Sequence, residues 1–214
     1  MQRILEPEIL DSLPSDHPDA LRNRRDLHLI NRLMGNHRWF AQTLPPLLRK
    51  GERTLELGAG LGELATRLAA KAIAVDGLDL WKKPADWPTH QLWHQTDLLA
   101  FDGFAPYRAV VGNLIFHQFS AAELLALGGK LGQHTRIILA CEPARLRSSQ
   151  LGFAVLGRAL GVNHVSLHDA HVSIAAGFAG EELPRALGLD PARWNFRCQT
   201  TWFGAYRMVG VRRA

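Results

Sequence analysis

Residues 56–62 read Glu-Leu-Gly-Ala-Gly-Leu-Gly, and this stretch decides the fold. It continues the strand-like run Thr54–Leu57 and precedes Glu63–Lys71, a run with apolar residues at helical spacing. Glycines let the chain turn sharply and let a ligand come close to the backbone. The amide groups at the start of the helix then face that ligand. A strand, a glycine loop and a helix in this order predict a binding loop in an α/β protein.

The rest of the chain alternates between short apolar runs and helical stretches. Further strands are expected at Ala72–Leu78, Gln91–Trp93, Tyr107–Leu114 and Arg136–Cys141, and a helix at Ala121–Leu131. Apolar strands separated by helices are typical of a parallel sheet covered on both faces. Two more runs, Phe196–Trp202 and Ala205–Arg212, flank Phe203–Gly204 and predict a hairpin. We therefore expect a Rossmann-like, doubly wound, mostly parallel sheet with a C-terminal antiparallel hairpin.

Two regions outside this alternation complete the expected organisation. Residues 1–50 are expected to form an N-terminal helical cap, whose first 20 residues are an irregular lead-in interrupted by prolines. Residues 51–214 are expected to form the ligand-binding domain. Within that domain, residues 143–181 depart from the alternation and predict a helical and loop insertion over the sheet edge.

Composition narrows the class of protein. The 214 residues are 47% hydrophobic and 21% charged, which suits one globular domain with a sizeable core. The formal net charge of +5 permits an anionic partner without requiring one. Cys141 and Cys198 form no CxxC pair, so neither a zinc site nor a disulfide framework is expected. The start of the chain does not resemble a secretory signal, and no long uncharged apolar run follows, which predicts a cytoplasmic protein without a membrane span.

The residues around the glycine loop indicate which ligand it takes. A dinucleotide fingerprint needs a third glycine at position 63, where this chain has Glu63. A carboxylate in the first turn of the helix repels a pyrophosphate. The P-loop pattern also fails, because no Gly-Lys-Ser/Thr follows. Glu56, just before the glycines, suits instead a ligand with a cationic group such as an ammonium.

Acidic residues also end the next two strands. Asp79 ends the second strand, where an acid in doubly wound folds binds ribose hydroxyls. Asp97 follows the third strand and suits an exocyclic amine of adenine. Together with Glu56, these acids describe a ligand that has an amino-acid end, a ribose and an adenine but no phosphate. S-adenosylmethionine fits that description.

This arrangement resembles the class I S-adenosylmethionine-dependent methyltransferases over residues 50–142 and the final hairpin. Val111–Leu114 matches the fourth-strand motif of that family. The resemblance implies a methyltransferase with S-adenosylmethionine as its cofactor. The implied cofactor-binding residues are Glu56, Gly58, Ala59, Gly60, Gly62, Asp79, Leu80, Asp97, Leu98 and Asn113.

A second, narrower resemblance is to the small methyltransferases found beside type III polyketide synthases. It rests on residues 24–27, 30–32, Gly35, 168–169, 172–174 and Phe178. Residues 140–145 depart from the Asn-Asp-Leu-type ending of that group. The resemblance implies O- or C-methylation of a small aromatic, quinone-like or polyketide acceptor.

Three histidines are candidates for the base that such a reaction uses when the acceptor is a phenol or an acidic carbon. His117 follows the fourth strand, although a surface or helix-capping role is equally open to it. His168 and His171 lie on the expected insertion, with Asp169 between them. A neighbouring aspartate stabilises an imidazolium, which suits a proton acceptor. The histidine spacing fits no standard zinc pattern, so no metal is expected.

Other residues are candidates for contact with the acceptor or for covering the cofactor. Glu142 ends the fifth strand and so points to the ligand crevice of an α/β sheet. Asp169 lies on the insertion. Trp39 is a candidate lid, although a Trp-Phe pair on a helix is more often part of the core. Asn31 and His37 lie in the same region and are further candidates.

Two other functions stay open. An RNA or protein methyltransferase would fit the positive charge, but residues 113–116 lack the Asn/Asp-Pro-Pro-Tyr element of the amino-group methylases that act on bases. No RNA-binding appendage is evident either, so nucleic acid is not an expected partner. A non-catalytic cofactor-binding protein would keep the loop and the acids without turnover. The expected partner is a small molecule, and a homodimer is compatible with the sequence.

Overall fold

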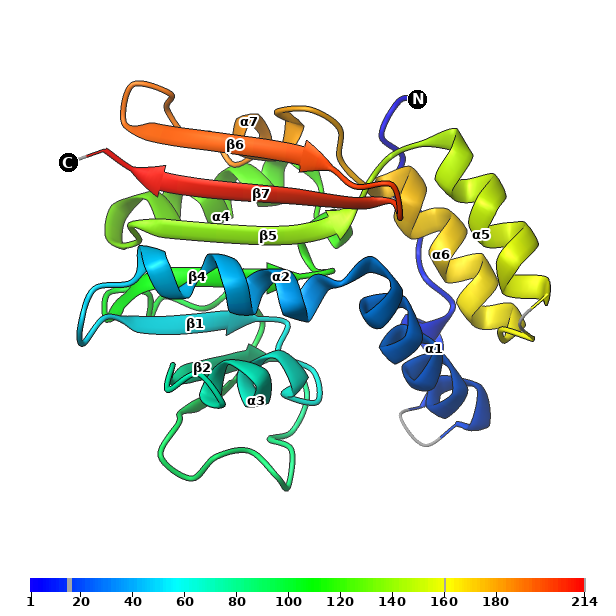
Figure 1. Cartoon of the computed structure of the whole chain (residues 1–214), viewed down its shortest axis with the longest axis horizontal. Helices are drawn as coiled ribbons and strands as arrows, with labels where there is room; N and C mark the ends of the chain where they lie inside the picture. Colours follow the sequence, from blue (N-terminus) through cyan, green and yellow to red (C-terminus); the bar gives the residue numbers. More distant parts are fainter. Residues whose placement is uncertain (15–16, 160, 214) are drawn as a thin grey trace.

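The computed structural model describes residues 1–14, 17–159 and 161–213. At its centre is a seven-stranded sheet in the order β3-β2-β1-β4-β5-β7-β6 (Figure 1). The strands are β1 (Arg53–Leu57), β2 (Val75–Asp79), β3 (Trp93–Gln95), β4 (Tyr107–Asn113), β5 (Ile137–Pro143), β6 (Trp194–Thr200) and β7 (Ala205–Arg212). Strands β1 to β5 are parallel, and β7 runs antiparallel between β5 and β6. The expected Rossmann-like fold with a C-terminal hairpin is confirmed.

The sheet is buried because helices cover both of its faces. Every residue of β5 is buried, as expected for a central strand of a mostly parallel sheet. Its side chains alternate between two cores: Ile138 and Ala140 face one, while Ile137 and Leu139 face the other. The α-helices of the described residues are α1 (Pro18–Met34), α2 (Asn36–Thr43), α3 (Glu63–Ala69), α4 (Ala121–His134), α5 (Arg147–Ala159), α6 (His164–Ala176) and α7 (Glu182–Ala186).

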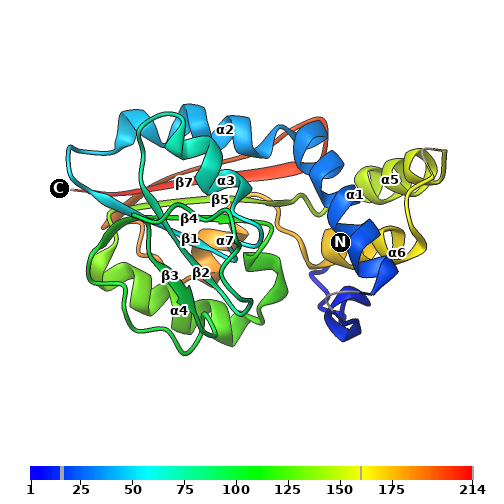
Figure 2. The same cartoon turned by 90° about the horizontal axis from the view of Figure 1, so that it is seen from below.

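Helices α2 and α3 pack on one face of the sheet, and α4 lies on the opposite face (Figure 2). Helices α1, α5 and α6 stand together beyond the carboxyl ends of the parallel strands (Figure 1). Gly35 allows the sharp change of direction from α1 to α2, because its φ of 66° is in the left-handed region. The segment expected as an insertion contains α5 and α6, which pack on each other, and α6 also packs on α1.

Two expectations differ from the structure. Strand β3 begins at Trp93 instead of Gln91, because the amide of Leu92 donates to the side chain of Asp76 and pairing with β2 starts at Gly77 and Trp93. The lead-in also has a defined course: residues 1–14 run past α6 and include a short 3-10 turn at Leu10–Ser12. Within the described ranges, none of the helices has the length and apolar character needed to cross a bilayer.

Candidate active site

A cavity of about 1590 Å³ lies at the carboxyl ends of the parallel strands. One side of it, here called the strand-end half, is lined by the glycine loop after β1 and by the residues that end or follow β2, β3 and β4. The other side, the helix half, is lined by α1, α5, α6, residues 8–13 and the turn between β6 and β7. Strands β1 and β4 are neighbours whose connections leave in opposite directions, and ligands of α/β sheets bind at this kind of switch point.

The glycine loop forms the floor of the strand-end half. Gly58, Gly60 and Gly62 have φ values of 63°, 52° and 78°, which only glycine adopts without strain. A Cβ on Gly60 would meet no atom within 4 Å, so this position leaves room for a ligand. A Cβ on Gly58 would collide with Ile115, and one on Gly62 with Trp87, so these two glycines serve packing. All the predicted cofactor residues except Gly62 line the cavity.

The carboxylates that end β2 and follow β3 are oriented by backbone amides. Asp79 accepts hydrogen bonds from the amide of Gly60 at 2.8 Å and from the amide of Trp81 at 2.9 Å. Asp97 accepts from the amide of Leu99 at 2.8 Å. These contacts fix both carboxylates at the rim of the strand-end half and leave each with lone pairs for a further donor.

The carboxylate of Glu56 has an incomplete set of hydrogen bonds among the described residues. Its Oε2 is buried and has no hydrogen-bond partner among the described residues. Burial raises the pKa of Glu56 well above its ordinary value, and the carboxylates of Asp79 and Glu63 raise it further. One backbone hydrogen bond with Ala65 acts in the opposite direction and lowers the pKa. A cationic group in the cavity would complete the hydrogen bonding and favour the ionised form. The residues present therefore fit the ammonium end of S-adenosylmethionine.

Three asparagines join the N-terminal helices to the end of β4. The side-chain amide of Asn36 donates to the oxygens of Asn31 and Asn113, both at 3.0 Å. The amide of Asn113 donates to Asn31 at 3.0 Å. Asn31 and Asn113 line the cavity, whereas Asn36 lies behind them and is fully buried. Sequence analysis missed Asn36, because nothing in the local pattern distinguishes it from a helix-capping residue.

Glu63 has partners on both N-terminal helices. Its carboxylate lies 2.8 Å from Nε2 of His28 and 3.9 Å from Nδ1 of His37. All three residues line the cavity. Burial lowers the pKa of His37 to about 4, and the charges of Arg67 and His28 act in the same direction. His37 is therefore neutral at pH 7.

Of the three histidines predicted as bases, the structure places His117 in the cavity lining. It lies in the turn after β4, is buried, and has Nδ1 2.7 Å from a carboxylate oxygen of Glu142. His168 and His171 are exposed on α6 and do not line the cavity. Their placement does not support the predicted role, because a base must reach the acceptor.

Glu142 holds the turn after β4. It is fully buried and accepts hydrogen bonds from the amides of Ile115 and Phe116 at 3.0 Å and of His117 at 3.2 Å, in addition to the contact with the His117 ring. Since it lies behind this turn and is not among the cavity-lining residues, the expected direct contact with the acceptor is corrected to a supporting position.

The other two acceptor candidates have different positions. Trp39 packs in the core, edge-on to Phe40 at 4.8 Å and under the guanidinium of Arg207 at 5.4 Å. The prediction that it covers the cofactor is corrected, because it lies outside the cavity. Asp169 does line the cavity, but its carboxylate accepts from the amides of Ile9 at 2.8 Å and Leu10 at 3.2 Å.

Comparison with known proteins gives a likeness in fold alone. No family model matches the sequence, and no curated protein does. The plantazolicin methyltransferase BpumL, in complex with a triazolic desmethylPZN analogue and SAH, has a TM-score of 0.71 at 11% identity, over 96% of this chain and 93% of that chain. The pyocyanin biosynthetic protein PhzM has a TM-score of 0.61 at 19% identity, over 96% of this chain and 62% of that chain.

A third structure is the magnesium protoporphyrin IX methyltransferase ChlM from Synechocystis PCC 6803 with bound SAH. It has a TM-score of 0.52 at 18% identity, over 88% of this chain and 84% of that chain. The strand order, the glycine loop and these likenesses define the fold. It is the Rossmann-like fold of the class I S-adenosylmethionine-dependent methyltransferases.

Proposed function

We propose that the protein is a cytoplasmic S-adenosylmethionine-dependent methyltransferase that acts on a small-molecule acceptor. The observation that carries this proposal is the unpartnered carboxylate oxygen of Glu56, buried beside the open space over Gly60. BpumL and ChlM, which share the fold, were solved with SAH bound. Two free cysteines are in keeping with a reducing compartment.

The strand-end half suits each part of the cofactor in turn. Glu56 would take the ammonium, since a buried carboxylate needs a cation. Asp79 would accept from the ribose hydroxyls, and Asp97 from the amine of adenine. The remaining predicted cofactor positions, Ala59, Leu80 and Leu98, line the same half and would contact the cofactor by packing.

When bound, S-adenosylmethionine supplies a methyl group on a positively charged sulfur, and the protein has to orient the acceptor and remove its proton. His117 is suited to hold that proton at Nε2, because Glu142 fixes Nδ1 and so sets the orientation of the ring. Burial opposes a charge on His117, but its hydrogen bonds to Glu142 and Glu8 outweigh burial and raise its pKa to about 9. The rate should therefore increase with pH up to about 9, as His117 becomes neutral.

The helix half supports a small aromatic, quinone-like or polyketide acceptor. Its apolar residues include Leu33, Phe153 and Ile174, which suit the body of a flat or extended apolar molecule. Serine hydroxyls lie among them at positions 148, 149, 166 and 173 and can orient oxygen substituents. Whether oxygen or carbon receives the methyl group depends on which acceptor atom the cavity aligns with the methyl–sulfur bond of the cofactor.

The experiment that tests the proposal is calorimetry of SAH binding to the wild type, Glu56→Gln and Asp79→Asn. We expect the wild type to bind and each variant to bind at least about tenfold more weakly, because a hydrogen bond to a charged group is worth about 1.5–3 kcal/mol. Glu181→Gln, on the exposed surface outside the cavity, is the matched control and should bind like the wild type. Binding of NAD or ATP without binding of SAH would refute the proposal.

A further inference from the structure

Arg3–Leu10, here called the strap, is fastened to both the turn after β4 and α6. The Arg3 guanidinium donates to the carbonyl oxygens of His117 at 2.9 Å, Phe119 at 2.7 Å and Ala176 at 2.7 Å. The strap therefore joins the turn after β4 to the end of α6. The turn after β4 lines the strand-end half of the cavity, and α6 lines the helix half.

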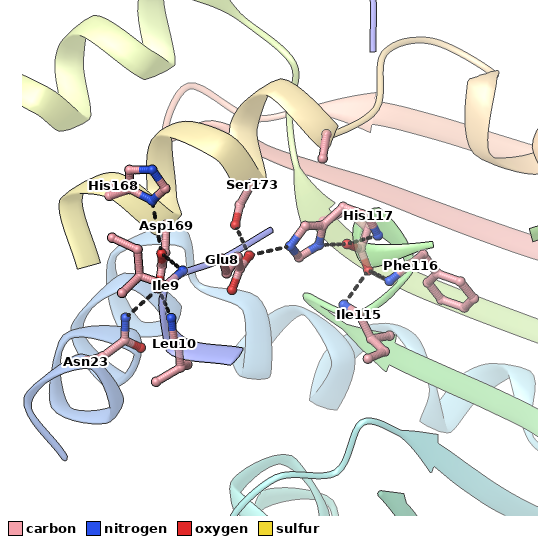
Figure 3. A network of polar contacts seen from close by, with 12 residues as sticks. Glu8, Ile9, Leu10, Asn23, Ile115, Phe116, His117, His168, Asp169 and Ser173 are labelled. Carbon is pink, nitrogen blue, oxygen red and sulfur yellow. Dashed lines mark hydrogen bonds and ion pairs between the residues drawn. The ribbon is translucent and has the colours of Figure 1, made fainter. Parts of the chain in front are cut away.

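Glu8, in the middle of the strap, faces the ring nitrogen of His117 that Glu142 leaves free. Its Oε1 lies 3.5 Å from Nε2 of His117 and accepts a hydrogen bond from the hydroxyl of Ser173 on α6 (Figure 3). The Glu8 side chain is 15% exposed and lines the cavity. His117 thus has one carboxylate on each ring nitrogen, one from β5 and one from the strap.

Asp169 holds the residues that follow Glu8. Its carboxylate accepts from the amides of Ile9 and Leu10 and, at 3.4 Å, from the side-chain amide of Asn23 on α1 (Figure 3). Asp169 is buried, so these hydrogen bonds are sheltered from water. The strap is fixed on both sides of Glu8, and this leaves little freedom for the Glu8 carboxylate to move away from His117.

The charged groups around His117 come from three places in the chain. Glu142 lies on β5; Glu8 and Arg3 belong to the strap; and His168 on α6 acts on Glu8 through its charge. Burial raises the pKa of Glu8, but its contacts with His117, Ser173 and His168 outweigh burial and lower it. Glu8 is therefore ionised at neutral pH.

We propose that Glu8 is a positioning residue of this active site: it fixes the His117 ring from the Nε2 side and fastens the strap as a wall of the helix half. The inference rests on the proposed function, because it treats His117 as the group that receives the acceptor's proton.

The first test measures His117 directly. NMR titration of the His117 ring in the SAH-bound protein should give an inflection near pH 9 in the wild type. In Glu8→Gln the inflection should fall by about one unit, because the facing negative charge is gone. Glu6→Gln is the matched control: it removes the same charge from the same segment at an exposed position and should leave the inflection unchanged. An unchanged inflection in Glu8→Gln overturns the inference.

The second test measures the strap. Amide hydrogen exchange of residues 4–10 should be at least about tenfold faster in Glu8→Gln than in Glu6→Gln. The strap of Glu8→Gln detaches more easily, because it lacks one charge-assisted contact that holds it in the wild type. Equal exchange in the two variants would mean that Glu8 does not fasten the strap. Should Glu8→Gln fail to fold, Glu8→Asp keeps the charge on a shorter side chain. Its strap amides should then exchange faster, and its His117 inflection should lie lower, than in Glu6→Gln, and equal values in these two variants would overturn the inference.

Kinetics separate this inference from the proposed function. Glu8→Gln should shift the pH–rate profile to lower pH and raise KM for the acceptor. The affinity for SAH should not change, because Glu8 lines the helix half and not the strand-end half. Glu8→Asp should restore part of the profile. Failure of the wild type to bind SAH would overturn the proposed function, whereas normal SAH binding with an unmoved profile in Glu8→Gln would overturn the role of Glu8 only.

Discussion

Gly60 leaves the space that a bound cofactor needs in the strand-end half. Its φ of 52° and the empty volume beside it mean that a side chain would extend into the strand-end half without touching other described residues. Gly60→Val is expected to abolish stabilisation by SAH in a thermal melt. Gly51→Val is the matched control, because Gly51 also has a positive φ and open space but lies outside the cavity. Normal SAH stabilisation of Gly60→Val would contradict this account.

His117 gives the stability of the protein a defined dependence on pH. The His117 pKa is about 9 in the folded state against 6.5 for an ordinary histidine, so its contribution is complete below pH 6.5 and disappears as pH rises through 9. That contribution is about 3 kcal/mol at most. Urea denaturation should give a larger difference in unfolding free energy between the wild type and His117→Gln at pH 6.5 than at pH 10. A constant difference would mean that His117 carries no raised pKa.

Single residues differ in how far the sequence could predict them. Asp79, Asp97 and Asn113 were placed correctly at the edge of the sheet, because a residue that ends a parallel strand lies there whatever the rest of the fold does. Glu8 was missed, since its contact with His117 joins segments far apart in the chain and leaves no local pattern. Trp39 was misplaced because helical spacing identifies an apolar side chain without telling which face it packs on.

At the scale of elements, α4 depends on the residue that starts it. Ser120 accepts a hydrogen bond from the amide of Glu123, and Glu123 accepts from the amide of Ser120, which forms a capping box. Ser120→Ala is expected to lower the unfolding free energy by about 0.5–2 kcal/mol in urea denaturation, with SAH affinity unchanged. Ser120→Asp, which can still cap, should retain most of the stability. Equal losses in the two variants would contradict a capping role.

The elements themselves followed from the sequence to different degrees. The central strands and the hairpin were predicted to within a few residues, because long apolar runs bounded by turns leave few alternatives. Strand β3 has only three residues, none of them fully buried, so its position depends on pairing with β2 and is invisible in the local pattern. Helices α5 and α6 were expected only as an insertion, because their positions depend on packing between them and of α6 on α1.

At the scale of the whole molecule, the cavity draws on most of the chain, from residues 8–13 to the turn before β7. A ligand that fills the strand-end half should therefore stabilise the native state as one unit. At 100 times its Kd, SAH is expected to add about 2.7 kcal/mol to the unfolding free energy. Denaturation with SAH, adenosine or NAD at equal concentration should rank SAH first. Stronger stabilisation by NAD would indicate a different ligand.

The positions of the tryptophans have a spectroscopic consequence. Trp39, Trp87 and Trp194 are buried away from the cavity, whereas Trp81 lines the strand-end half and Trp202, fully exposed, lines the helix half. Trp93, the sixth tryptophan, is partly buried outside the cavity lining and donates through Nε1 to the carbonyl of Trp81. Intrinsic fluorescence therefore carries one cavity-lining tryptophan for each half. Fluorescence quenching that is lost in Trp81→Phe would report binding of the nucleoside. A blue shift that is lost in Trp202→Phe would report binding of the methyl acceptor. Unlabelled candidate substrates can therefore be screened by the tryptophan emission of the protein.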